Sequence, residues 1–149
     1  MKQETKCLHS GYVPKNGEPR QMPIYQSTTF KYDSSDAMGR LFDLEDSGYF
    51  YTRLQNPSND MTAAKIADLE GGVAALATAS GAAAITYAIQ ALAYAGEHIV
   101  AQKTIYGGSY NLLAHTLPQY GISTTFVDAH NLEEVENAIQ DNTKAIYLE

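Results

Sequence analysis

The chain has 149 residues, a formal net charge of −7, 44% hydrophobic residues and 18% charged residues. This balance fits a globular protein with a core of ordinary size, and the negative charge disfavours nonspecific binding to nucleic acid or anionic membranes. No apolar run of about 18 residues, no signal-peptide pattern and no second cysteine beside Cys7 occurs, so we expect a cytoplasmic protein.

The first part of the chain, residues 1–58, predicts an extended arm. It holds four of the five prolines and one short helical pattern at residues 35–44, which Ser34 or Ser35 caps. Its many aromatic side chains have few local partners. We therefore expect the arm to pack on another subunit, which predicts a homo-oligomer.

The remainder, residues 59–149, predicts alternating helices and strands. We expect helices over residues 59–70, 81–94, 106–119 and 132–139, and strands over residues 73–79, 98–101, 122–128 and 144–149. Helix 81–94 is apolar on nearly all faces, which predicts burial. The alternation is typical of a parallel α/β sheet, in which ligands bind beyond the carboxyl ends of the strands.

A strand-to-helix junction at Ser80-Gly81 is the first candidate site. Ser80 is a natural N-cap, and the glycine lets a ligand approach the backbone. The free N–H groups of Gly81 and Ala82 suit a phosphate. A turn that only caps the helix is the alternative.

Three more side chains suggest a phosphorylated, ring-bearing cofactor. Arg53 follows three aromatic residues, and its guanidinium matches a phosphate; Tyr51 would lie on the same side of an extended segment. Tyr106, before two glycines, offers a face for a heteroaromatic ring. A surface arginine and packing tyrosines are the alternatives. No metal-ligand spacing, dinucleotide loop or hydrolase motif occurs, so we expect no metal.

Five ordered motifs give these residues a family resemblance. The chain resembles the N-terminal part of the Cys/Met-metabolism enzymes that depend on pyridoxal 5'-phosphate (PLP), a cystathionine γ-synthase-like family. The resemblance covers nearly all 149 residues and rests on Pro23 to Phe30, Tyr51-Thr52-Arg53 with Asn56-Pro57-Ser58, Leu69 to Gly72, Ser80-Gly81, and Tyr106-Gly107-Gly108.

The resemblance implies the N-terminal part of a fold-type I, aspartate aminotransferase-like transferase, with an extended arm and an incomplete, mainly parallel sheet. Residues 1–58 would form the arm for subunit contacts and the neighbouring active site, and residues 59–149 the first part of the large PLP-binding domain. The family's site implies cofactor binding by Gly81, Ala82, Tyr106, Tyr51 and Arg53, with the last two reaching a neighbouring subunit's phosphate. Tyr106 would also be catalytic, and the family implies a dimer or tetramer.

Segments 31–36 and 41–45 are most similar to O-acetylhomoserine sulfhydrylases. This similarity implies γ-replacement on a small amino-acid substrate by a sulfur nucleophile, as in methionine biosynthesis and transsulfuration. Methionine γ-lyase and the cystathionine synthases and lyases are the alternatives. The family's Schiff-base lysine lies beyond Glu149, so we expect a fragment that is inactive alone. A noncatalytic assembly or phosphate-binding module stays open as a different class.

Overall fold

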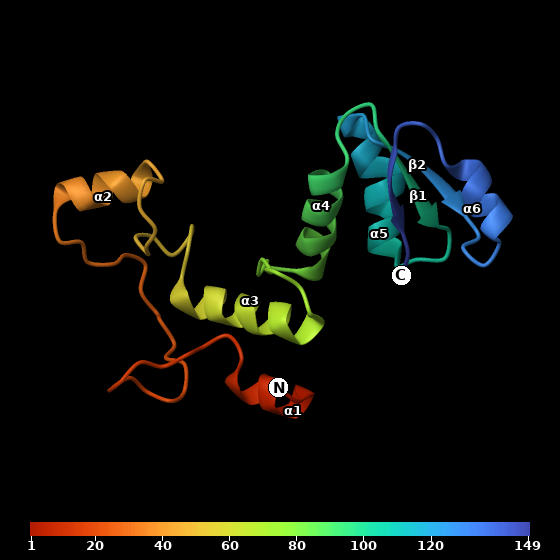
Figure 1. Ribbon diagram of the computed structural model, residues 1–149. Helices are drawn as coiled ribbons and strands as arrows, with labels where there is room; N and C mark the ends of the chain where they lie inside the picture. The colour runs from red at the N-terminus through yellow and green to blue at the C-terminus, as the bar shows by residue number, and fades with distance from the viewer. The chain divides into compact units, whose positions relative to one another are not determined.

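The computed structural model describes residues 1–149, and the chain divides into two compact units, Met1–Ala77 and Thr78–Glu149 (Figure 1). Each unit has its own helices, and only Thr78–Glu149 contains a sheet. The predicted division into an arm of residues 1–58 and a domain of residues 59–149 concerns the assembly of a whole protein and stays a prediction. None of the helices combines the length and apolar character needed to cross a bilayer.

Unit Met1–Ala77 contains three helices, α1 (Gln3–His9), α2 (Ser35–Phe42) and α3 (Pro57–Glu70). The Ser34 side chain caps α2 by accepting from the Ala37 N–H, as the sequence predicts. Helix α3 begins earlier than predicted, because Asn56 is the N-cap and Pro57 occupies the first turn, where its missing N–H costs nothing. Helix α1 was not predicted.

Polar contacts hold α1 against α3. The Lys6 ammonium lies 2.9 Å from Asp68 Oδ1 and also donates to the Asp68 carbonyl, while the Ser10 hydroxyl donates to Asp68 Oδ2. The Ser10 hydroxyl and the Lys6 ammonium lower the pKa of Asp68 below its ordinary value. Since the segment Met1–Ser10 thus has local partners, part of the predicted arm is anchored within its own chain.

Unit Thr78–Glu149 is a small doubly wound α/β layer. Helix α4 (Gly81–Leu92) precedes three parallel strands in the order β2-β1-β3. These strands are β1 (His98–Gln102), β2 (Ser123–Val127) and β3 (Thr143–Tyr147). Helices α5 (Gly107–Asn111) and α6 (Leu132–Ala138) lie on opposite sides of the sheet (Figure 1), as right-handed crossovers in both directions require.

The hydrophobic core lies between β1 and the helical side that contains α4 and α5. Ile99 and Ala101 of β1 are fully buried, and they pack with Ile89 of α4 and with Leu113 and Leu117. The predicted parallel α/β arrangement is therefore present in this unit.

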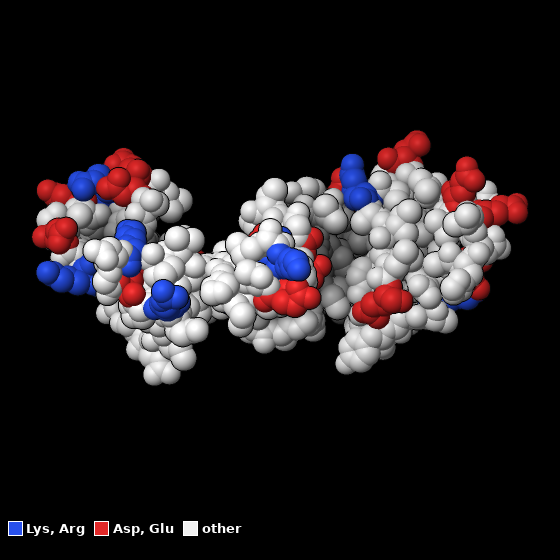
Figure 2. Space-filling model, turned by 60° about the horizontal axis from the view of Figure 1, so that its bottom comes forward, with Lys and Arg blue, Asp and Glu red and all other residues white.

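Acidic side chains gather over α6, at the right of Figure 2, where Glu133, Glu134 and Glu136 follow the N-cap.

The helical run after Tyr106 is not uniform. Helix α5 continues into a π-helical turn, Leu112–Thr116, and a 3₁₀ turn, Leu117–Tyr120. Pro118 lies in that 3₁₀ turn, and the run ends at Gly121, whose φ of 80° favours glycine. The predicted helix 106–119 is thus correct in extent but consists of three geometries.

Two predictions about the regular helices and strands are wrong. Residues 73–79 do not form a strand, because they pair with no other segment, and a strand needs a partner for its N–H and C=O groups. Helix α4 is not buried on all faces, because Ile89 is its only buried residue while Tyr87 and Leu92 are 55% and 57% exposed.

A buried histidine connects all three strands. His98 is 1% exposed; its Nδ1 lies 2.8 Å from Thr143 Oγ1 of β3 and its Nε2 lies 2.8 Å from Thr125 Oγ1 of β2. Burial lowers the pKa of His98. The folded protein therefore favours the neutral imidazole, whereas the unfolded chain takes up a proton near pH 6.5.

We predict that acidification from pH 7.5 to 5.5 lowers the free energy of unfolding through His98. In this window the unfolded chain binds more protons than the folded one, so stability falls by at most about 1.4 kcal/mol per pH unit. Urea unfolding at several pH values measures the slope. His98→Gln should flatten it and His130→Gln, at an exposed position, should not; equal slopes for both variants would contradict the role of His98.

Candidate functional site

The N-terminus of α4 presents free backbone donors. The Ser80 hydroxyl accepts from the Ala83 N–H at 3.1 Å, and the Ser80 carbonyl accepts from the Ala84 N–H. The N–H groups of Gly81 and Ala82 have no acceptor within the helix. A Cβ at Gly81 would meet no atom within 4 Å, and the first turn holds no acidic residue. This end of α4 therefore has the donors, the room and the dipole that a phosphate group requires.

Tyr106 immediately precedes α5 and presents its ring to solvent. The residue is 72% exposed, and its ring lies over Gly108, where a Cβ would come within 2.4 Å of Tyr106 Cε1. The missing side chain at Gly108 thus lets the ring lie along the first turn of α5. An exposed aromatic face held in this way can stack on a planar heterocycle.

A carboxylate next to Tyr106 was missed as a functional residue by sequence reasoning. Glu149 follows β3, and its Oε2 accepts from the Tyr106 N–H at 2.6 Å. Its Oε1 accepts from the Ser109 hydroxyl at 2.5 Å and from the Tyr147 hydroxyl at 2.6 Å. The only available signal was the position of Glu149 at the carboxyl end of a predicted strand.

In unit Met1–Ala77, Tyr51 and Arg53 lie next to each other, but on a turn. Tyr51 forms an antiparallel bridge with Thr29, and its carbonyl accepts from the Leu54 and Gln55 N–H groups. This turn, rather than the predicted extended segment, brings the Arg53 guanidinium to 5.2 Å from the Tyr51 ring centroid. Arg53 is exposed and forms no salt bridge, whereas Arg40 pairs with Asp46 at 2.7 Å.

Asn56 organises the residues around that turn. It is 4% exposed, and its amide donates to the Tyr25 carbonyl and the Thr52 hydroxyl while its oxygen caps α3 through Ser58. The Asn-Pro pair therefore couples the Tyr51–Arg53 turn to the start of α3.

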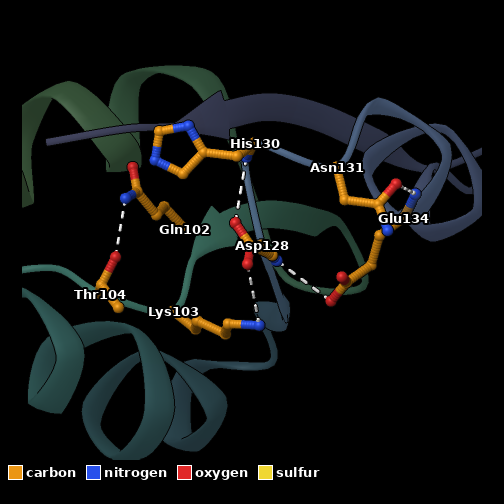
Figure 3. Close-up of polar contacts among 7 residues, drawn as sticks. All are labelled: Gln102, Lys103, Thr104, Asp128, His130, Asn131 and Glu134. Carbon is orange, nitrogen blue, oxygen red and sulfur yellow. Dashed lines mark hydrogen bonds and ion pairs between the residues drawn. The ribbon is translucent and has the colours of Figure 1, made fainter.

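The polar residues at the carboxyl ends of β1 and β2 form hydrogen bonds and an ion pair with one another (Figure 3). Asp128 accepts from the His130 N–H at 3.1 Å and lies 3.5 Å from the Lys103 ammonium. The His130 N–H and the Lys103 ammonium lower the pKa of Asp128. Glu134 accepts from the Asp128 N–H. These contacts leave the Asp128 carboxylate engaged, and Asn131 caps α6 by accepting from the Glu134 N–H.

The structure thus distributes the predicted site residues over both units. Gly81, Ala82 and Tyr106 belong to unit Thr78–Glu149, in which α4 packs against α5. Tyr51 and Arg53 belong to unit Met1–Ala77. No group of three or more His, Cys, Asp or Glu side chains is arranged to hold a metal ion.

Comparison with curated proteins finds close relatives in sulfur amino-acid metabolism. The chain is 46% identical over 145 residues to an L-methionine γ-lyase of Fusobacterium nucleatum subsp. polymorphum, covering 97% of this chain and 37% of the relative. It is 45% identical over 150 residues to an O-acetyl-L-homoserine sulfhydrylase of Leptospira meyeri, covering 100% of this chain and 34% of the relative. The chain therefore spans about a third of the length of these relatives.

Solved structures agree on the fold. A Campylobacter jejuni protein assigned as an O-acetylhomoserine (thiol)-lyase, with pyridoxyl-lysine monophosphate, superposes with a TM-score of 0.89 at 36% identity, covering 98% of this chain and 36% of that one. A cystathionine γ-lyase of Lactobacillus plantarum complexed with L-serine gives 0.85 at 36% identity, covering 99% and 36%. The fold is that of the N-terminal part of the fold-type I PLP enzymes.

A family model described as "Cys/Met metabolism PLP-dependent enzyme" matches residues 4–149. With nearly the whole chain matched, the chain belongs to the Cys/Met-metabolism family of PLP-dependent enzymes.

Proposed function

We propose that this chain supplies the phosphate and ring contacts of a PLP-dependent enzyme that acts on sulfur amino acids. The observation that carries the proposal is the free N-terminus of α4, where the N–H groups of Gly81 and Ala82 have no acceptor within the helix and a Cβ at Gly81 would meet no atom within 4 Å. An exposed Tyr106 ring in the same unit adds a stacking face. Family membership makes PLP the group that these donors fit.

Each candidate residue has a defined task in this proposal. The N–H groups of Gly81 and Ala82 bind the phosphate, and the Arg53 guanidinium binds it bidentately with the Tyr51 hydroxyl beside it. The Tyr106 ring orients the cofactor by stacking, and the Tyr106 Oη transfers a proton at the substrate. When bound, PLP withdraws electrons from carbanions at the α and β carbons of the substrate.

Within this class we propose an O-acetylhomoserine sulfhydrylase-like transferase that replaces acetate by a sulfur nucleophile. Methionine γ-lyase is the second candidate, because the identity to one relative of that name is 46%, against 45% to an O-acetyl-L-homoserine sulfhydrylase. Assays of the whole protein separate the two. O-acetylhomoserine with sulfide would yield homocysteine and acetate, whereas methionine and water, without sulfide, would yield methanethiol, 2-oxobutanoate and ammonia.

We also propose that the whole protein is a cytoplasmic homo-oligomer, a dimer or a tetramer. In this assembly Tyr51 and Arg53 of one subunit reach the phosphate of its neighbour. The support is that Arg53 is exposed and forms no salt bridge within its own chain. A guanidinium without a carboxylate partner is available to a ligand or to a second subunit.

The proposed phosphate site at the N-terminus of α4 predicts that Gly81→Ala weakens PLP binding without destabilising the fold. The added methyl meets no protein atom within 4 Å, but it occupies the room through which a phosphate approaches the N–H groups. We expect the PLP dissociation constant of the whole protein to rise about tenfold or more. The matched control is Gly39→Ala, at a glycine of α2 where an added Cβ also meets no atom within 4 Å. Unchanged PLP affinity in Gly81→Ala would exclude phosphate binding at the N-terminus of α4.

For Arg53 we predict that Arg53→Ala weakens PLP binding more than Arg20→Ala or Arg40→Ala. A charge-assisted hydrogen bond contributes about 1.5–3 kcal/mol, which corresponds to a roughly 10- to 150-fold change in the dissociation constant. Equilibrium titration of the whole protein with PLP measures all three variants. Similar dissociation constants throughout would refute the phosphate role of Arg53.

The two tasks of Tyr106 predict different effects for two substitutions. Tyr106→Phe keeps the ring and should leave PLP binding intact while slowing turnover by about a hundredfold or more, because the proton-transferring hydroxyl is lost. Tyr106→Ala should also weaken PLP binding, by roughly three- to tenfold. Binding titrations and kcat values give both readouts, and identical behaviour of Phe and Ala would show that the two tasks do not exist.

A further inference from the structure

The Glu149 carboxylate joins the end of β3 to the start of α5. Its two oxygens accept three hydrogen bonds, from the Tyr106 N–H and from the hydroxyls of Ser109 and Tyr147. Ser109 is 3% exposed and lies on α5, and Tyr147 is the last residue of β3. Two of the three donors are therefore fixed by packing, and they fix the carboxylate in turn.

The electrostatics of this contact favour an ionised Glu149. The donors Ser109, Tyr147 and Tyr106, in this order, lower the pKa of Glu149. Burial and the neighbouring carboxylate raise the pKa of Tyr147, so its hydroxyl keeps the proton that it donates. At neutral pH an anion thus accepts the Tyr106 N–H, and such bonds are stronger than neutral ones.

Tyr106 is consequently restrained on two sides. Glu149 holds its backbone N–H at 2.6 Å, and the absent side chain of Gly108 leaves the space in which its ring lies. Residues 105–108 contain two consecutive glycines, which alone would leave the backbone free to adopt many conformations. The Glu149 contact removes that freedom at the residue whose ring is exposed.

We propose that Glu149 is a positioning residue, which sets the Tyr106 ring for the cofactor by holding the Tyr106 N–H. This inference rests on the proposed function, because it assumes that PLP stacks on Tyr106. Glu149 touches neither substrate nor cofactor in this role and acts through Tyr106 alone.

The test compares Glu149→Ala and Glu149→Gln with a matched control, Glu97→Ala, in the whole protein. Glu97 makes the same kind of contact, because its Oε2 accepts from the Tyr94 N–H at 2.6 Å. Titration with PLP gives the dissociation constant, and the visible circular dichroism of bound PLP reports the orientation of its ring.

We expect Glu149→Ala to raise the PLP dissociation constant by roughly three- to tenfold and to reduce the visible dichroism. Glu149→Gln should recover most of both, because its amide oxygen accepts from Tyr106 while its amide N–H donates to Ser109. Glu97→Ala should match the wild type. If Glu149→Ala also matched the wild type, or if Glu97→Ala were equally affected, Glu149 would have no specific role.

A double-mutant cycle tests whether Glu149 acts through Tyr106. In a Tyr106→Ala background, Glu149→Ala should not change the PLP dissociation constant further. A persistent effect would overturn the inference while leaving the proposed function standing. Failure of the wild-type protein to bind PLP would instead overturn the proposed function, and with it the role of Glu149.

Discussion

The pairing of β1 with strands on both of its sides is the constraint on which unit Thr78–Glu149 depends. Ile99, Val100 and Ala101 are all 0% exposed, so the central strand is buried on both faces and along both edges. Because all three strands are parallel, their carboxyl ends meet at one edge. That edge brings together Tyr106, which follows β1, and Glu149, which follows β3, although 43 residues separate them in sequence.

Local sequence patterns correctly predicted the features that depend on neighbouring residues in the chain, such as helix caps and helix ends. Ser34 and Ser80 cap their helices as expected, and glycine ends α3 at Gly71, where φ is 72°. The strand pattern of residues 73–79 failed for the opposite reason. A short apolar run describes only a tendency, and a strand exists when another segment accepts and donates its hydrogen bonds. A helix is likewise buried only where other elements pack against it. Although α4 is apolar on nearly all faces, Ile89 is its only buried residue.

The site residues that belong to short sequence motifs could be predicted, whereas the residues that only tertiary contacts bring together could not. Ser80-Gly81 and Tyr106-Gly107-Gly108 are adjacent residues, so their local geometry follows from turn and cap preferences. The proximity of Arg53 to Tyr51 depends on a turn that Asn56 stabilises from α3. Glu149 could not be assigned from sequence, because its partners Ser109 and Tyr106 reach it only after the sheet has formed.

The unpaired segment 73–77 has a consequence for the behaviour of the chain in solution. It reads Val-Ala-Ala-Leu-Ala, has no charge or proline, and exposes Val73 and Leu76 by 106% and 80%. Extended apolar segments with free N–H and C=O groups associate edge to edge. At neutral pH the net charge of −7 keeps copies of the chain apart. Near the sequence-derived isoelectric point of about 5.0 that repulsion is smallest, so self-association of the chain should be strongest there.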